Sequence, residues 1–145
     1  MTVAQWERLG VRRVGSKSFP RLSDAAFVLA PAGAQGPAFV MLPNFRVIMK
    51  YNPAEAYALA IGHLADRLRG GDPIEQPWPR DERLLSHAEG FELQQLLARH
   101  GYDVGEPDGL IGPRTRTALR QFQASIGATP DGFASTHILG RLRAE

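Results

Sequence analysis

The first part of the chain carries short apolar runs and one partly alternating segment, both of which are typical of β-strands. Short apolar runs at residues 27–29 and 39–42 flank a turn or loop at Pro31–Gly36. Residues 45–51 then partly alternate between apolar and other side chains, which predicts a further strand. Residues 2–10 precede these runs and have the capping pattern of a short helix. We therefore expect an antiparallel hairpin or small sheet after a short N-terminal helix.

A longer helix is predicted to follow the strands. Asn52 suits the N-cap, Pro53 the first helical position and Glu55 the first turn. An apolar stripe at helical spacing runs through the segment, and Gly70-Gly71 ends it. The stripe consists of Tyr57, Ile61, Leu64, Ala65 and Leu68.

The C-terminal part of the chain predicts three helices. Ser86 and Glu89 form a capping box at the start of the first helix, and Pro113 suits the first position of the second. Each helix has one apolar face at a spacing of three and four residues. These faces are Leu93, Leu96 and Leu97; Ala118, Leu119, Phe122 and Ile126; and Ile138, Leu139 and Leu142.

The two loops between these helices repeat a short motif. Pro107-Asp108-Gly109 recurs as Pro130-Asp131-Gly132, each time shortly before a helix. In such a turn proline presets one dihedral angle, aspartate bonds its own backbone, and glycine adopts a positive φ. We expect a rigid turn at each copy rather than a solenoid repeat, which would need more copies.

The predicted fold class is α+β and mostly helical, with a small β-hairpin or sheet plus helix followed by a three-helix bundle. We expect a first unit over residues 1–72, a Gly- and Pro-rich linker over 73–82, and a second unit over 83–145. The chain has 145 residues, 43% hydrophobic and 22% charged, as in ordinary soluble proteins.

Charge and residue counts narrow the classes of function. A net charge of +2 with interspersed signs does not call for a nucleic-acid partner, and the absence of cysteine excludes disulfides and thiolate sites. Charged residues interrupt the N-terminus where a signal peptide needs its apolar stretch. No apolar run is long enough to span a membrane.

Two further chemistries are not expected. The four histidines lack ligand spacing, so we expect neither a metal site nor a cofactor. Arg114, Arg116 and Arg120 lie on one predicted helix and could suggest a DNA reader. The adjoining loops are too long for a helix-turn-helix, and charges on one helix usually form a solvated face.

The run ELQQLLARHGYDVGEPDGLIGPRTRTALRQFQASIGATPDGFAS resembles the peptidoglycan-binding domain found at the ends of bacterial wall hydrolases. The matching features are Leu93-Gln94, Gly101-Tyr102, the two Pro-Asp-Gly turns, Gly112-Pro113 and Phe122-Gln123, with Thr115 and Ala118 between them. The resemblance implies that the second unit binds peptidoglycan.

The segment GPAFVMLPNFRVIMKYNPAEAYALAIGHLADRL resembles the C-terminal end of the catalytic domain of membrane-bound B-type lytic murein transglycosylases. WERLGVRR near the N-terminus fits the same region. In that family one catalytic glutamate protonates the glycosidic oxygen and helps to form a 1,6-anhydromuramoyl product, whereas ordinary glycosidases pair two carboxylates. That glutamate lies in a part of the domain that precedes this chain. We therefore expect a truncated transglycosylase that is inactive alone.

The resemblance gives candidate residues in the first unit. Tyr51 and Asn52 match a Tyr-Asn pair that lines the glycan cleft in the family. There tyrosine can stack on a sugar ring and asparagine can bond its polar groups. The alternative is that Tyr51 ends a strand and Asn52 caps a helix, with no ligand.

Candidate residues in the second unit lie in its first loop and at the start of its second helix. A helix N-terminus suits a carboxylate, and peptidoglycan stem peptides carry several. Arg114 could add a bidentate bond. The alternative, plain turn and cap chemistry, applies chiefly to Asp108, Gly109 and Gly112. The full predicted set is Asp108, Gly109, Gly112, Arg114 and Thr115.

The predicted function is peptidoglycan binding at the periplasm or cell envelope, or in the cytoplasm if the chain is not exported. One alternative is an active lytic transglycosylase completed by the missing catalytic segment. A second is a helical protein-interaction domain. We also expect residues 1–72 to expose apolar surface, and to be less ordered than residues 83–145 or to self-associate.

Overall fold

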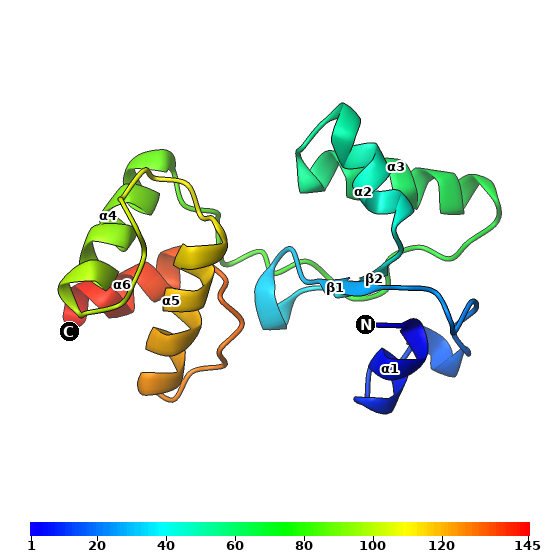
Figure 1. Ribbon diagram of the computed structural model, residues 1–145, viewed down its shortest axis with the longest axis horizontal. Helices are drawn as coiled ribbons and strands as arrows, with labels where there is room; N and C mark the ends of the chain where they lie inside the picture. Colours follow the sequence, from blue (N-terminus) through cyan, green and yellow to red (C-terminus); the bar gives the residue numbers. More distant parts are fainter. The chain divides into compact units, whose positions relative to one another are not determined.

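The structure is a computed structural model that describes residues 1–145 (Figure 1). It is α+β and mostly helical, as predicted, with six α-helices and one two-stranded antiparallel sheet. Its contacts divide it into two compact units. Unit 1 comprises Met1–Pro31 and Pro37–Pro77, and unit 2 comprises Ala32–Gly36 and Trp78–Glu145.

Unit 1 begins with α1 (Val3–Arg8), a short helix closed by the predicted capping box. The Thr2 hydroxyl accepts a hydrogen bond from the backbone N–H of Gln5, whose side chain accepts one from Thr2 N. The Trp6 indole N–H donates to the backbone oxygen of Ala26 at 3.1 Å. This bond ties α1 to the residues that precede the first strand.

The two predicted strands are present as an antiparallel pair. β1 (Phe27–Leu29) pairs with β2 (Phe39–Met41), and Val28 lies opposite Val40. Between them, Gly33–Gln35 forms a single 3₁₀ turn. The apolar runs on either side of a turn-rich segment were therefore sufficient to place this hairpin.

The predicted strand at residues 45–51 is wrong, because this segment is the helix α2 (Asn44–Tyr51). Phe45 is buried, and Ile48 and Met49 pack against the same core at helical spacing. Val47, which strand alternation would have placed beside Phe45, is exposed. The partial alternation also fits a helical spacing, and burial decides between the two.

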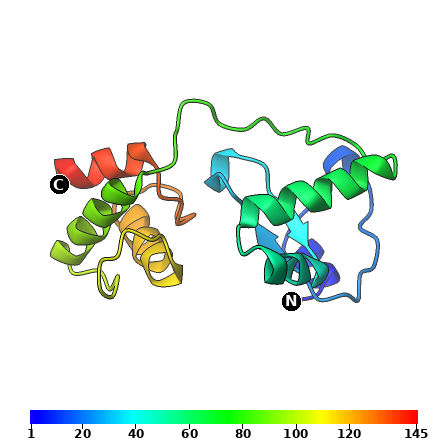
Figure 2. The ribbon, with the colours of Figure 1, turned by 90° about the horizontal axis from the view of Figure 1, so that it is seen from above.

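The predicted start of the next helix is also wrong. α3 is Glu55–Leu68 and its N-cap is Ala54, whereas Asn52 ends α2. The Asn52 side-chain oxygen accepts a hydrogen bond from Ala54 N at 3.0 Å, so it stabilises the turn between the two helices. α2 and α3 contact each other within unit 1 (Figure 2).

The apolar stripe of α3 lies largely at the surface. Ala58 is the buried residue of this helix, whereas Tyr57, Ile61, Leu64 and Leu68 are exposed. The buried cluster under these helices is small and consists of Leu29, Phe45 and Ala58, and Val3 and Ala26 are the other buried hydrophobic residues of unit 1. Unit 1 therefore carries the exposed apolar surface that the sequence predicted.

Unit 2 contains the three predicted helices, α4 (His87–Arg99), α5 (Pro113–Ser125) and α6 (Thr136–Ala144). Ser86 and Glu89 form the capping box of α4, and Pro113 is the first residue of α5, both as predicted. The Ser135 hydroxyl caps α6 by accepting from Ile138 N. No helix in either unit combines the length and the apolar character needed to cross a membrane.

One apolar core holds the three helices of unit 2 together. It takes in nearly every residue that the sequence assigned to the three apolar faces, and Leu96 and Ile126 pack at its edge. Tyr102 lies edge-on to Phe122, with ring centroids 6.1 Å apart. The buried members are Leu93, Leu97, Val104, Ala118, Leu119, Phe122, Ala134, Ile138, Leu139 and Leu142.

Truncation of a central leucine is expected to unfold unit 2 selectively. Leu139 is 1% exposed, so Leu139→Ala leaves a cavity and is expected to cost about 2–5 kcal/mol of unfolding free energy. Leu84 is 71% exposed, so Leu84→Ala is the matched control and is expected to change little. Amide hydrogen exchange in α4–α6 measures the change in unfolding free energy of each variant. Equal protection in the two variants would contradict the assignment of this core.

Acid is expected to weaken unit 2 through Glu89. Hydrogen bonds from the Arg83 guanidinium, followed by those from Ser86, lower the pKa of Glu89 from 4.5 to about 2. A lowered folded-state pKa means that the stabilisation is present above the unfolded value and is lost as the pH falls from about 5 to about 2. Denaturation midpoints across this range are therefore expected to fall less steeply in Glu89→Gln than in the wild type.

The control for this pH dependence is Glu106→Gln. Glu106 is exposed and has no side-chain hydrogen bond or ion pair, so this substitution is expected to leave the acid dependence of unit 2 unchanged. Curves of equal slope for Glu89→Gln and the wild type would show that the Arg83–Glu89 pair contributes nothing to the acid response.

Candidate functional site

A buried glutamine fixes the first Pro-Asp-Gly turn of unit 2. Gln94 lies on α4 and is 1% exposed. Its side-chain oxygen accepts hydrogen bonds from Asp108 N at 2.9 Å and Gly109 N at 2.7 Å. Its Nε2 group donates to the Asp108 carboxylate, the Leu110 backbone oxygen and the Thr115 hydroxyl, at 3.0–3.1 Å. One side chain thus joins α4, the turn and the start of α5.

The aspartate of this turn is held in its charged form. The Gln94 amide, and then the backbone N–H of Leu110, donate to its carboxylate and lower the pKa of Asp108. Gly109 has a φ of 78°, and a Cβ atom there would lie 2.7 Å from the His87 ring. A Cβ on Gly90 would lie 2.5 Å from the Gly109 oxygen, so the turn and α4 approach as closely as glycine allows.

The second turn has the same construction. Gln123 of α5 is 5% exposed, accepts from Gly132 N at 2.8 Å and donates to the Asp131 carboxylate at 2.7 Å. The same Asp131 oxygen accepts from Phe133 N at 2.9 Å. Gly132 has a φ of 73°. Each Pro-Asp-Gly turn is therefore locked by a buried glutamine from the helix before it.

Sequence reasoning did not assign a structural role to either glutamine. Each one directly follows a buried apolar residue, as Leu93-Gln94 and Phe122-Gln123, on the helix that precedes its turn. Each therefore lies next to the apolar face, where a polar residue needs an internal partner. That position, together with the downstream Pro-Asp-Gly turn, was the available signal.

The structure brings together most of the residues predicted in this loop. Asp108, Gly109 and Thr115 all bond to Gln94, and Thr115 is 2% exposed. Gly112 is the N-cap of α5, with extended backbone and no side chain to cap the helix. Asp108, Gly109 and Thr115 therefore shape the loop, so their contacts are those of turn and cap chemistry.

Arg114 differs from its neighbours because its side chain is 73% exposed. Its guanidinium lies 3.7 Å from the Asp103 carboxylate, beyond ordinary hydrogen-bond distance. It projects from the first turn of α5, next to backbone N–H groups that a helix leaves without internal partners. Of the predicted residues in unit 2, this cation has the greatest freedom to contact a ligand.

The other predicted pair lies in unit 1. Tyr51 is 84% exposed, and its ring lies 6.2 Å from that of Tyr57, so the two form an exposed aromatic pair. Asn52 uses its side-chain oxygen within the α2–α3 turn, which leaves its amide N–H groups without a protein acceptor. No group of three potential metal-binding side chains occurs in either unit.

Replacing Gln94 is expected to unlock the first turn. Gln94→Leu leaves the backbone N–H of Gly109 buried without an acceptor, and the unfolding free energy of unit 2 is expected to fall by about 2 kcal/mol or more. Gln95→Leu is the matched control, because Gln95 is exposed on the same helix and is expected to change stability by less than about 0.5 kcal/mol. Hydrogen exchange at Asp108 and Gly109 reports the difference. Unchanged protection at these amides would contradict the locking role.

Two protein families match separate parts of the chain. Residues 1–66 match the family described as the transglycosylase SLT domain, and residues 86–142 match the putative peptidoglycan binding domain. A 43-residue stretch is 42% identical to the putative OxPP cycle protein OpcA of Synechocystis sp., and covers 30% of this chain and 9% of that protein.

Two solved structures resemble the whole chain. They are SltB3 from Pseudomonas aeruginosa in complex with NAG-NAM-pentapeptide and in complex with NAG-anhNAM-pentapeptide. Each has a TM-score of 0.95 and 43% identity over 99% of this chain, which spans 39% of the SltB3 chain. Residues 1–66 are therefore similar to the transglycosylase SLT domain and residues 86–142 to a putative peptidoglycan-binding domain, in the order in which SltB3 also aligns with the chain.

Proposed function

We propose that unit 2 binds peptidoglycan at the bacterial cell envelope. The observation that carries the proposal is the match of residues 86–142 to the peptidoglycan-binding family. The similarity to SltB3, whose structures contain NAG-NAM-pentapeptide and NAG-anhNAM-pentapeptide, supports the same ligand class.

The geometry of the first loop supports a preformed contact surface. Gln94 fixes Asp108, Gly109 and Thr115, so the start of α5 is held in place without a ligand. Gly112 leaves open space beside the first N–H groups of α5. Arg114 projects from this rigid base and suits a carboxylate of the stem peptide. In this arrangement Asp108, Gly109 and Thr115 position the loop, whereas Gly112 and Arg114 face the ligand.

We also propose that this chain binds the wall without cleaving it. A general acid for glycosidic cleavage needs a raised pKa, which burial usually supplies. None of the acidic side chains in unit 1 is buried, and the ion pair with Lys17 lowers the pKa of Asp72. These features favour binding over catalysis by these residues.

A second contact is proposed in unit 1, because residues 1–66 match the transglycosylase SLT domain. The exposed ring of Tyr51, paired with Tyr57, offers a surface on which a sugar ring can stack. The free amide N–H groups of Asn52 lie next to it in sequence and can donate to a hydroxyl or N-acetyl oxygen. This pair would add glycan contact to the binding by unit 2.

Cosedimentation with purified peptidoglycan sacculi tests the proposal. The full chain is expected to pellet with sacculi and to release no soluble muropeptides. Arg114→Ala is expected to pellet about three- to tenfold more weakly, since one charge-assisted contact is lost. Arg99→Ala, which removes an exposed arginine at the end of α4, is the matched control.

Each other outcome selects an alternative. Release of 1,6-anhydro muropeptides by the purified chain would show transglycosylase activity and contradict binding without cleavage. A chain that stays in the supernatant would contradict wall binding and favour a protein-interaction domain. Equal weakening by Arg114→Ala and Arg99→Ala would show that net charge, rather than the start of α5, governs the binding.

A further inference from the structure

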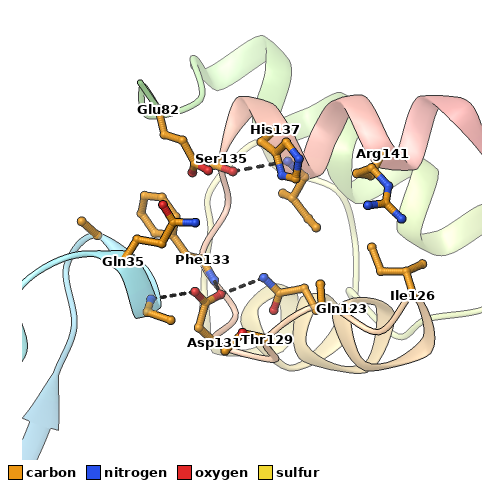
Figure 3. A pocket seen from close by; sticks show the side chains of 14 residues that line it. Gln35, Glu82, Gln123, Ile126, Thr129, Asp131, Phe133, Ser135, His137 and Arg141 are labelled. Carbon is orange, nitrogen blue, oxygen red and sulfur yellow. Dashed lines mark hydrogen bonds between the residues drawn. The ribbon is translucent and has the colours of Figure 1, made fainter. Parts of the chain in front are cut away.

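Unit 2 contains a pocket with a volume of about 150 Å³ at its second turn (Figure 3). It lies between the end of α5, the Pro-Asp-Gly turn at residues 130–132 and the start of α6. Ala32, Ala34 and Gln35, which belong to unit 2 by their contacts, complete its wall. Its principal lining residues are Gln123, Ile126, Asp131, Phe133, His137 and Arg141.

The base of the pocket is rigid because its polar atoms are already paired. Gln123 bonds to Asp131 and Gly132, and the second Asp131 oxygen accepts from Ala34 N at 2.8 Å. The Ser135 hydroxyl is committed to capping α6. These groups shape the pocket and leave recognition to the side chains around them.

Two cationic or protonatable side chains on α6 have no partner within the protein. His137 and Arg141 lie four residues apart, which places them on one face of the helix, and both line the pocket (Figure 3). Both are exposed, and neither makes a hydrogen bond or an ion pair. They contrast with Arg143 on the same helix, which is paired with Glu92 at 2.7 Å.

The remaining walls supply a small apolar surface and one opposite charge. Ile126, Ala128 and Phe133 line the pocket beside the two α6 side chains. Glu82 lies at the other side of the pocket from Arg141 and also makes no hydrogen bond or ion pair (Figure 3). A matching ligand therefore has a carboxylate, a small apolar group and, within reach of Glu82, a cation.

We propose that this pocket binds the carboxylate-bearing end of a peptidoglycan stem peptide. The inference rests on the proposed function and assigns the ligand part and its site. A guanidinium can bind a carboxylate through two parallel hydrogen bonds, and His137 adds a second donor. A terminal alanine methyl fits against Ala128 and Ile126, and the amine of a diamino acid would pair with Glu82. The small volume suits one terminal residue better than a disaccharide.

Nuclear magnetic resonance titration of the ¹⁵N-labelled full chain tests this site. The probes are NAG-NAM-pentapeptide and NAG-NAM without its peptide. The pentapeptide is expected to shift amides at residues 129–133 and 137–141, and the peptide-free disaccharide is expected to leave them in place. Arg141→Gln is expected to weaken pentapeptide binding at least about tenfold, and Arg141→Lys by about threefold, because lysine keeps the charge but loses the paired donors.

The controls separate this proposal from the proposed function. Arg99→Gln removes an exposed arginine outside the pocket and is expected to leave pentapeptide affinity unchanged. Thermal melting of Arg141→Gln confirms that the fold is retained, since Arg141 is exposed and unpaired. If the wild type binds sacculi but the pentapeptide shifts only amides of the loop before Arg114, the pocket is not the stem-peptide site and the proposed function still holds. If the wild type does not bind sacculi, both the pocket proposal and the proposed function are contradicted.

Discussion

The hydrogen bonds between buried glutamines and Pro-Asp-Gly turns are the constraint on which unit 2 depends. A turn with a positive-φ glycine leaves backbone N–H groups that neither helix can satisfy, and burial makes an unpaired group costly. Gln94 and Gln123 each supply the missing acceptor and use their amide N–H groups on the turn aspartate. The same construction appears twice, so both interhelical loops are fixed without a ligand.

These hydrogen bonds separate the polar residues of unit 2 into those that position the loops and those that are available to bind a ligand. The side chains of Asp108, Thr115 and Asp131 form hydrogen bonds with Gln94 or Gln123 inside the fold, and these bonds position the loops. Arg114 and Arg141 project from helices without a hydrogen-bonded internal partner, so a ligand can engage their cations without displacing a hydrogen bond within the protein. The residues that are most engaged within the protein are therefore distinct from those with the greatest capacity for recognition.

The sequence predicted the features that arise from local chemistry. Both capping boxes, Pro113 at the start of α5 and the positive-φ glycines of the two turns depend on residues close together in the chain, and each is present. The segment at 45–51 was misread because its apolar residues fit both a strand and a helix. Only burial against Leu29 and Ala58 distinguishes them, and that burial is a tertiary property.

The candidate site was harder to predict for the same reason. Gln94 lies fourteen residues before Asp108, and the pocket around Arg141 combines side chains from residues 32–36 and 82–141, so no local pattern reveals either. The Pro-Asp-Gly repeat located both loops but could not separate positioning from recognition. That distinction follows from which polar atoms already form hydrogen bonds, and it moves attention from the turn aspartates to the exposed arginines Arg114 and Arg141.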